Sequence, residues 1–132
     1  KVVSGGELSR ISLAIQVITS KVSRVPTLIF DEVDAGIGGR VAEMVGTLLK
    51  QLGSAHQILC ITHLPQVAAM GDQHWLITKI KDAKHAQGIS SHIDDLNQQA
   101  RVEEIARMLG GATITTITRQ HAAEMLQKCQ NT

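Results

Sequence analysis

The fold is decided by the sequence TLIFDEVD at residues 27–34. Its first four residues form a short, largely apolar run, which is typical of a strand buried on both faces of a parallel sheet. A second run of this kind, Gln57–Ile61, is followed by Thr62 and His63. Helical periodicities lie before, between and after the two runs. This alternation predicts an α/β layered fold, with a mostly parallel sheet flanked by helices.

Two of the predicted helices have a clear apolar stripe. The first covers residues 4–22, and its stripe is Leu8, Ile11, Ile15, Ile18 and Val22. The second covers residues 41–52, and its expected buried face is Val41, Met44, Val45, Leu48 and Leu49. A short helix or turn is expected to begin at Leu64. An antiparallel pair of strands is expected at 75–80 and 89–93, with a polar connection at 81–88. Two further helices are expected at 98–109, ended by Gly110-Gly111, and at 117–128.

Composition limits the functions that this segment can have by itself. Its 132 residues suit one compact domain or part of a larger one. With 13 basic and 12 acidic side chains, the net charge of +1 gives no electrostatic case for nucleic-acid binding. The two cysteines have no neighbours at metal-ligand spacing, which argues against zinc. Neither a membrane span nor a signal peptide is evident, so a cytoplasmic protein with no membrane partner is expected.

Asp31 and Glu32 follow the first strand directly. Ligand sites of open α/β sheets lie at the carboxyl edge of the strands, where these two acids are expected. Adjacent residues on an extended chain point in different directions, so one acid can face a magnesium ion while the other orients or deprotonates a water. A pair of solvated acids at a strand end explains this motif about equally well.

Ser4-Gly5-Gly6-Glu7 begins the first helix. The sequence fits the S-x-x-E capping box, with Ser4 as the N-cap. The unpaired N–H groups of a helix N-terminus attract anions, and two glycines allow a phosphate to approach the backbone. A capping box without any ligand is the simpler explanation of this motif taken alone.

His63 follows the second strand through Thr62, again at a carboxyl end. A histidine at that position can hydrogen-bond a terminal phosphate. An ordinary polar residue at a strand-to-loop junction is the alternative, and it is favoured for an isolated histidine.

In this order, the three motifs resemble those of the ATP-binding-cassette ATPases, and in particular the heads of chromosome-maintenance and repair proteins, in which Glu follows Gly-Gly in place of the more usual Gln. The longer runs are similar to the RecN family of bacterial DNA repair proteins. These runs are VSGGELSRI at 3–11, TLIFDEVDAGIGG at 27–39 and ITHLPQVA at 61–68. The resemblance covers essentially the whole chain.

The resemblance implies a role for each motif. Ser4, Gly5, Gly6 and Glu7 would form the signature motif, which contacts the γ-phosphate of ATP bound to a partner head. Asp31 would be the Walker B aspartate that holds Mg²⁺, and Glu32 the general base or water-orienting residue. The loop from Asp34 to Gly39 would cross to the opposing nucleotide site, and His63 would be the switch histidine. Two such heads would self-associate around ATP, and the whole protein would act on DNA in double-strand-break repair and recombination.

One element of the family is missing from these residues. The P-loop, G-x-x-x-x-G-K-[ST], is absent, and the glycine-rich run at 36–40 has no Lys-Ser/Thr. The chain is therefore expected to be the C-terminal lobe of a P-loop NTPase head, residues 1–132, with the P-loop lobe and a coiled coil N-terminal to Lys1, and to be inactive alone. A non-catalytic dimerisation or partner-binding module, and the nucleotide-binding subunit of another cassette ATPase such as a transporter, stay open as alternatives.

Overall fold

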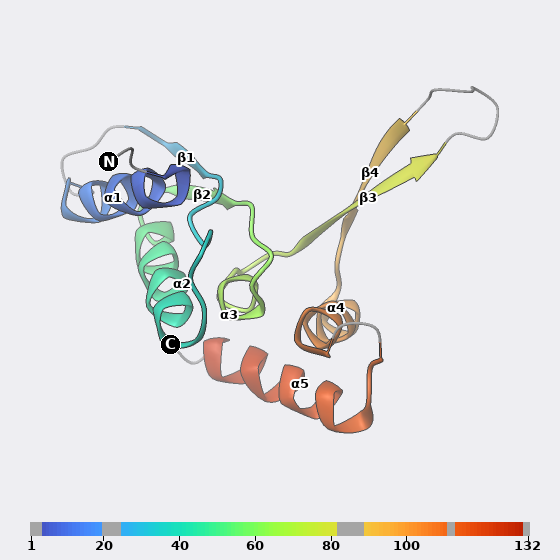
Figure 1. Cartoon of the computed structure of the whole chain (residues 1–132). Coiled ribbons are helices and arrows are strands. Elements are labelled where there is room, and N and C mark those ends of the chain that lie inside the picture. The colour runs from blue at the N-terminus through green and yellow to red at the C-terminus, as the bar shows by residue number, and fades with distance from the viewer. Residues whose placement is uncertain (1–3, 20–24, 82–88, 111–112, 131–132) are drawn as a thin grey trace.

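The computed structural model describes residues 4–19, 25–81, 89–110 and 113–130, and shows a mixed α/β chain (Figure 1). In order, the elements are α1 (Gly5–Thr19), β1 (Thr27–Phe30), α2 (Gly39–Gly53), β2 (Gln57–Cys60), α3 (Pro65–Ala68), β3 (Trp75–Lys81), β4 (Ile89–Asp95), α4 (Gln98–Gly110) and α5 (Thr116–Gln130). The predicted elements are present, with ends shifted by a few residues. Residues 20–22 of the first predicted helix, most of the connection at 81–88, and Gly111 lie outside the described residues. Over the described residues, no helix has the length and apolarity needed to cross a membrane.

The two strands expected at the centre of the fold form a parallel pair. Their register joins Thr27 to Gln57 and Phe30 to Cys60, and α2 makes the crossover between them. The pairing continues past both strand ends, since the Gln57 N–H donates to Pro26 O at 2.8 Å and the Ile61 N–H donates to Phe30 O at 2.9 Å. Because the strands are parallel, the residues that follow each of them emerge at one edge of the sheet.

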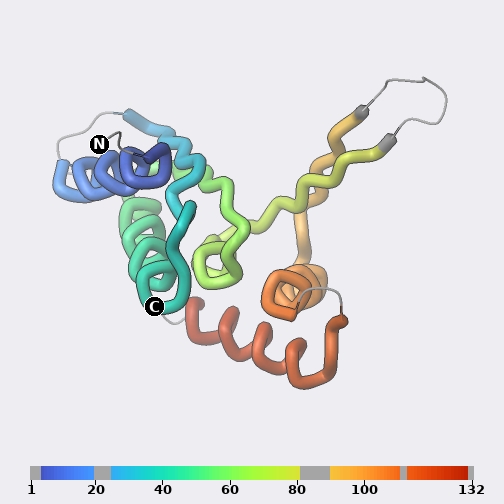
Figure 2. The backbone as a smooth tube through the Cα atoms, viewed as in Figure 1, coloured from blue at the N-terminus to red at the C-terminus, as the bar shows by residue number. Residues whose placement is uncertain are grey.

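The sheet content differs from the mostly parallel sheet predicted from sequence. Within the described ranges there are two separate two-stranded sheets, β1–β2 and β3–β4, and only the first is parallel. The antiparallel pairing of β3 with β4 is confirmed, with Ile77 opposite Ile93. Only the seven residues 82–88 separate these two strands in the sequence, whereas a parallel pair requires a crossover connection of about a dozen residues or more. Figure 2 shows these two strands extending away from the helices.

The first helix begins as predicted but buries the opposite face. The Ser4 Oγ accepts a hydrogen bond from the Glu7 N–H at 3.3 Å, and the Glu7 carboxylate accepts one from the Ser4 N–H at 3.0 Å, which confirms the capping box. The predicted stripe is exposed, however: Leu8, Ile11, Ile15 and Ile18 are 53–81% accessible. The helix contacts the core through Leu13 and Val17 instead. These two residues are also four apart, so the chain carries an apolar pair on each side of the helix.

The second helix packs on the parallel strands through a face rotated from the predicted one. Its buried residues are Ala42, Val45, Gly46, Leu49 and Leu52. Val45 and Leu49 were expected there, but Val41 and Met44 are about half exposed or more. Small residues explain the difference, because Gly46 lets α2 approach α3 closely: a Cβ at this position would lie 2.9 Å from the Met70 side chain.

A second hydrophobic cluster joins α3, α4 and α5. It contains Ala68, Ala69, Ile105, Ala106, Ala122, Leu126 and Cys129. The buried Arg101 of α4 ties this cluster to the turn after α3, since its guanidinium donates to Gly71 O at 2.7 Å and to Asp72 O at 3.3 Å. This cluster supports the C-terminal helices, whereas the cluster around β1 and α2 supports the candidate site.

Replacing Ile105 by Ala should lower the free energy of unfolding by about 2–5 kcal/mol, because this fully buried side chain would leave a cavity between α4 and α5. The matched control is Ile117→Ala on α5, whose side chain is 80% exposed and whose loss should change stability by about 0.5 kcal/mol or less. Denaturant unfolding followed by circular dichroism measures both. Equal losses for the two variants would contradict the described packing.

Candidate nucleotide-binding site

The acidic pair and the histidine motif lie at one edge of the parallel strands. β1 ends at Phe30, β2 ends at Cys60, and these two residues are register partners. Asp31 and Glu32 therefore leave the sheet beside Thr62 and His63. The side chains of Asp31, Glu32 and His63 are exposed, so all three are accessible to a ligand at this edge.

Asp34 connects the two motifs from inside the chain. Its side chain is 2% exposed, and its Oδ2 accepts hydrogen bonds from the Thr62 hydroxyl and from the His63 N–H, the latter at 3.1 Å. The same oxygen lies 3.4 Å from His63 Nδ1. The Thr62 hydroxyl in turn accepts a hydrogen bond from the Leu64 N–H at 3.0 Å. Asp34, the first residue of the loop expected to cross to an opposing nucleotide site, thus directs its side chain toward Thr62 and His63 of its own chain.

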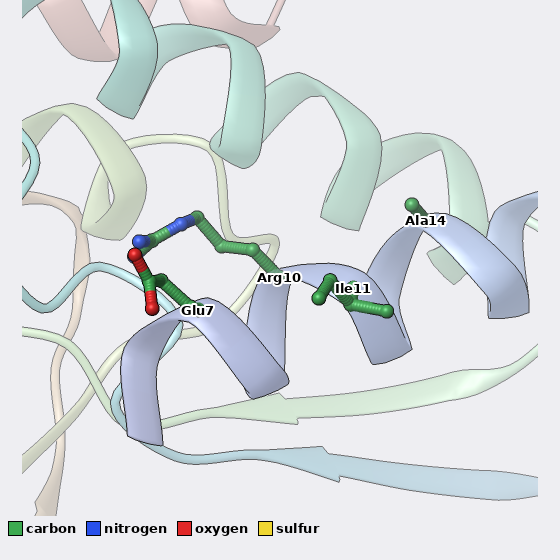
Figure 3. Close-up of a pocket in the computed structure, with 4 residues that line it drawn as sticks. All are labelled: Glu7, Arg10, Ile11 and Ala14. Carbon is green, nitrogen blue, oxygen red and sulfur yellow. The ribbon is translucent and has the colours of Figure 1, made fainter. Parts of the chain in front are cut away.

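The start of α1 is bound to the loop that carries the carboxylates. The Ser9 hydroxyl donates to Asp31 O at 2.9 Å. The Arg10 guanidinium donates to Ala35 O at 2.9 Å and to Val33 O at 3.4 Å. In Figure 3, Arg10 and Glu7 point toward one another from successive turns of α1, beside a shallow pocket that Ile11 and Ala14 complete. Three hydrogen bonds from one helical turn therefore hold the backbone on both sides of Glu32.

The glycine motif fits closely against that loop. A Cβ on Gly5 would lie 2.7 Å from Glu32 Oε2, and one on Gly6 would lie 2.9 Å from the Ala35 Cβ. Glu32 itself has a φ of 57°, in the left-handed region that costs a non-glycine residue about 1–3 kcal/mol. Strained residues of this kind concentrate at functional sites. The glycine motif and the acidic pair, 24 or more residues apart in sequence, are thus in direct contact.

The carboxylates of Asp31 and Asp34 act on the Cys60 thiol at this edge of the sheet. Burial, together with the negative charges of Asp34 and Asp31, raises the pKa of the Cys60 thiol to about 12, so this cysteine stays protonated and is a poor nucleophile. Among the described residues, no group of three or more His, Cys, Asp and Glu side chains could enclose a metal ion. An Mg²⁺ ion needs no such cage, because it is held by one or two carboxylates together with phosphate and water oxygens. The exposed carboxylate of Asp31 fits that mode.

Comparison with known proteins adds independent evidence. The chain is 53% identical over 131 residues to the DNA repair protein RecN of Xylella fastidiosa (strain Temecula1), a match that covers 98% of this chain. Proteins with the same name from Haemophilus influenzae and Bacillus subtilis are 51% and 46% identical, over 96% and 97% of this chain. The chain is a relative of RecN. No protein-family model matches it.

The chain is much shorter than these RecN proteins. It spans 23% of the length of the Xylella fastidiosa relative and 22% of the other two. The motifs that resemble RecN lie in this shared segment. Those of their residues that the structure describes meet at one edge of the sheet.

The sequence motifs do not identify two residues that contribute to the site, Ser9 and Arg10. Both lie within the run that resembles RecN, but nothing in the capping-box pattern assigns them a partner 22 to 25 residues away. One signal was present: Arg10 is three residues after Glu7, which puts both side chains on one face of the helix. That spacing identifies the face but not the loop that packs against it.

Proposed function

We propose that this chain is the C-terminal lobe of an ATP-hydrolysing head of a DNA repair protein of the RecN type. One observation carries the proposal: the glycine-bearing helix start, Asp31-Glu32 and Thr62-His63 converge at the carboxyl edge of two parallel strands. The names of the relatives support the repair function. A layered P-loop fold would be completed by a P-loop lobe that is not among these 132 residues.

The exposure and position of each residue indicate its role in ATP hydrolysis. Asp31 would hold Mg²⁺, which supplies charge neutralisation at the phosphates of bound ATP. Glu32 would orient the attacking water or take its proton, and the exposed His63 ring would hydrogen-bond the terminal phosphate. Ser4, Gly5, Gly6 and Glu7 would present the N-terminus of α1 to the ATP of a second head. Self-association of heads and action on DNA belong to the whole protein.

The exposed apolar face of α1 favours a second candidate function. This face is an apolar stripe of the kind that mediates contacts between proteins, and it consists of Leu8, Ile11, Ile15 and Ile18. A non-catalytic binding module would use this stripe and would need neither Glu32 nor His63. The two functions differ in one respect that can be measured, which is ATP turnover.

The full-length protein, by which we mean a full-length RecN protein that contains this chain as its matching segment, is the form to test. It should hydrolyse ATP. Turnover should depend on Mg²⁺ and should fall to background when the metal is chelated, because the phosphate charge is then not neutralised. Release of inorganic phosphate with and without a chelator measures this. Turnover that is absent in both conditions would favour the binding module.

A further inference from the structure

Asp34 is the one acid of the DEVD motif whose side chain is buried. Asp31 and Glu32 are exposed, whereas the Asp34 side chain is 2% accessible. Burying a carboxylate is costly unless hydrogen bonds compensate for the lost water. A carboxylate at this position therefore calls for a specific set of donors.

Among the described residues, the hydrogen-bond donors to the Asp34 carboxylate come from one dipeptide, Thr62-His63. The Thr62 hydroxyl and the His63 N–H both donate to Oδ2, and His63 Nδ1 lies 3.4 Å from the same atom. Hydrogen bonds to an ionised acceptor are roughly twice as strong as neutral ones. One oxygen thus fixes the backbone, the neighbouring hydroxyl and one side of the imidazole ring.

The His63 ring has little else to hold it. Its side chain is 70% exposed, so the ring has ample space to change rotamer. With Nδ1 turned toward Asp34, the other ring nitrogen, Nε2, is left for a ligand beyond the chain. The contact also joins the loop after β1 to the loop after β2, and so fixes the separation between Glu32 and His63.

We infer that Asp34 is a positioning residue that holds the Thr62-His63 turn and so orients His63 toward the terminal phosphate. It acts through His63 and touches no nucleotide with its own carboxylate. This inference rests on the proposed function, since it assigns a purpose to the contact only if ATP is hydrolysed at this edge.

The test compares Asp34→Ala with Asp34→Asn in the full-length protein. Asp34→Ala should lower kcat about 10- to 100-fold, the scale of a misplaced catalytic group, and change KM for ATP by less than about 3-fold. Asp34→Asn keeps an oxygen that accepts from Thr62 and His63, and should recover kcat to within about 5-fold of wild type. The matched control is Asp95→Ala, an exposed acid on β4, which should leave both constants unchanged.

Hydrogen exchange of a peptide spanning residues 61–64 tests the contact itself. The His63 amide should be protected in the wild type and lose that protection in Asp34→Ala. A wild-type His63 amide that exchanges as fast as an unbonded loop amide would overturn the inference, even if Asp34→Ala does not fold. So would a kcat for Asp34→Ala within 2-fold of wild type. A wild-type protein without turnover but with a protected His63 amide would refute the proposed function and leave the contact standing.

Discussion

Glu32→Gln should slow ATP hydrolysis by the full-length protein by about two orders of magnitude or more, while ATP binding persists. A general base contributes roughly 10²- to 10⁴-fold to a reaction rate, and an amide cannot take the proton of the attacking water. The amide has the same shape as the carboxylate, so the closely packed region around Gly5 should stay intact. Single-turnover hydrolysis and equilibrium binding of ATP give the two quantities separately.

The control for this variant is Glu43→Gln, which removes an exposed acid from α2 away from the strand ends. It should hydrolyse ATP at the wild-type rate. If Glu32→Gln also turns over at the wild-type rate, Glu32 has no part in the chemistry. If it loses ATP binding as well, the residue has a structural role at the contact with Gly5.

Ser4→Arg should abolish the ATP-dependent association of two heads. Ser4 lies at the N-terminus of α1, where a phosphate bound by a second head would approach, and a long cationic side chain would fill that space. Binding of ATP to one head should persist, because Ser4 is not expected to touch the nucleotide of its own head. Light scattering or analytical ultracentrifugation with and without ATP measures the association.

The companion variant Ser4→Ala separates the cap from the contact. The Ser4 hydroxyl accepts from the Glu7 N–H, and loss of such a cap costs about 1 kcal/mol in either variant. Ser4→Ala adds no bulk, so its heads should still associate with ATP, with at most a modest loss of stability. Normal association of Ser4→Arg heads would rule out the proposed contact between chains.

The parts of the fold that depend on local sequence could be predicted. The capping box at Ser4, the apolar runs of β1 and β2 and the β3–β4 hairpin each follow from a few neighbouring residues, and each is confirmed. The buried face of α1 could not be predicted, because Leu13 with Val17 and Leu8 with Ile15 both fit a helical period. Tertiary packing against α2 and the strands selects the first pair, and no local pattern encodes that choice.

The positions of the candidate site residues in the fold could be predicted, whereas their contacts could not. Asp31, Glu32 and His63 were expected at strand ends and lie there, because parallel strands with a crossover helix bring their carboxyl ends together. The inward direction of Asp34 depends on a donor 28 residues further along the chain, the Thr62 hydroxyl. The hydrogen bond from the Arg10 guanidinium to Ala35 O likewise joins residues that are 25 positions apart. Such long-range pairs follow from the folded geometry alone.

We propose that this chain holds part of an ATPase site that a second lobe completes. ATP turnover by the purified 132-residue chain, measured beside the full-length protein at equal molar concentration, tests it most directly. Phosphate release should stay at background for the chain alone, which lacks a P-loop, and should be Mg²⁺-dependent for the full-length protein. Robust Mg²⁺-dependent turnover by the isolated chain would contradict it.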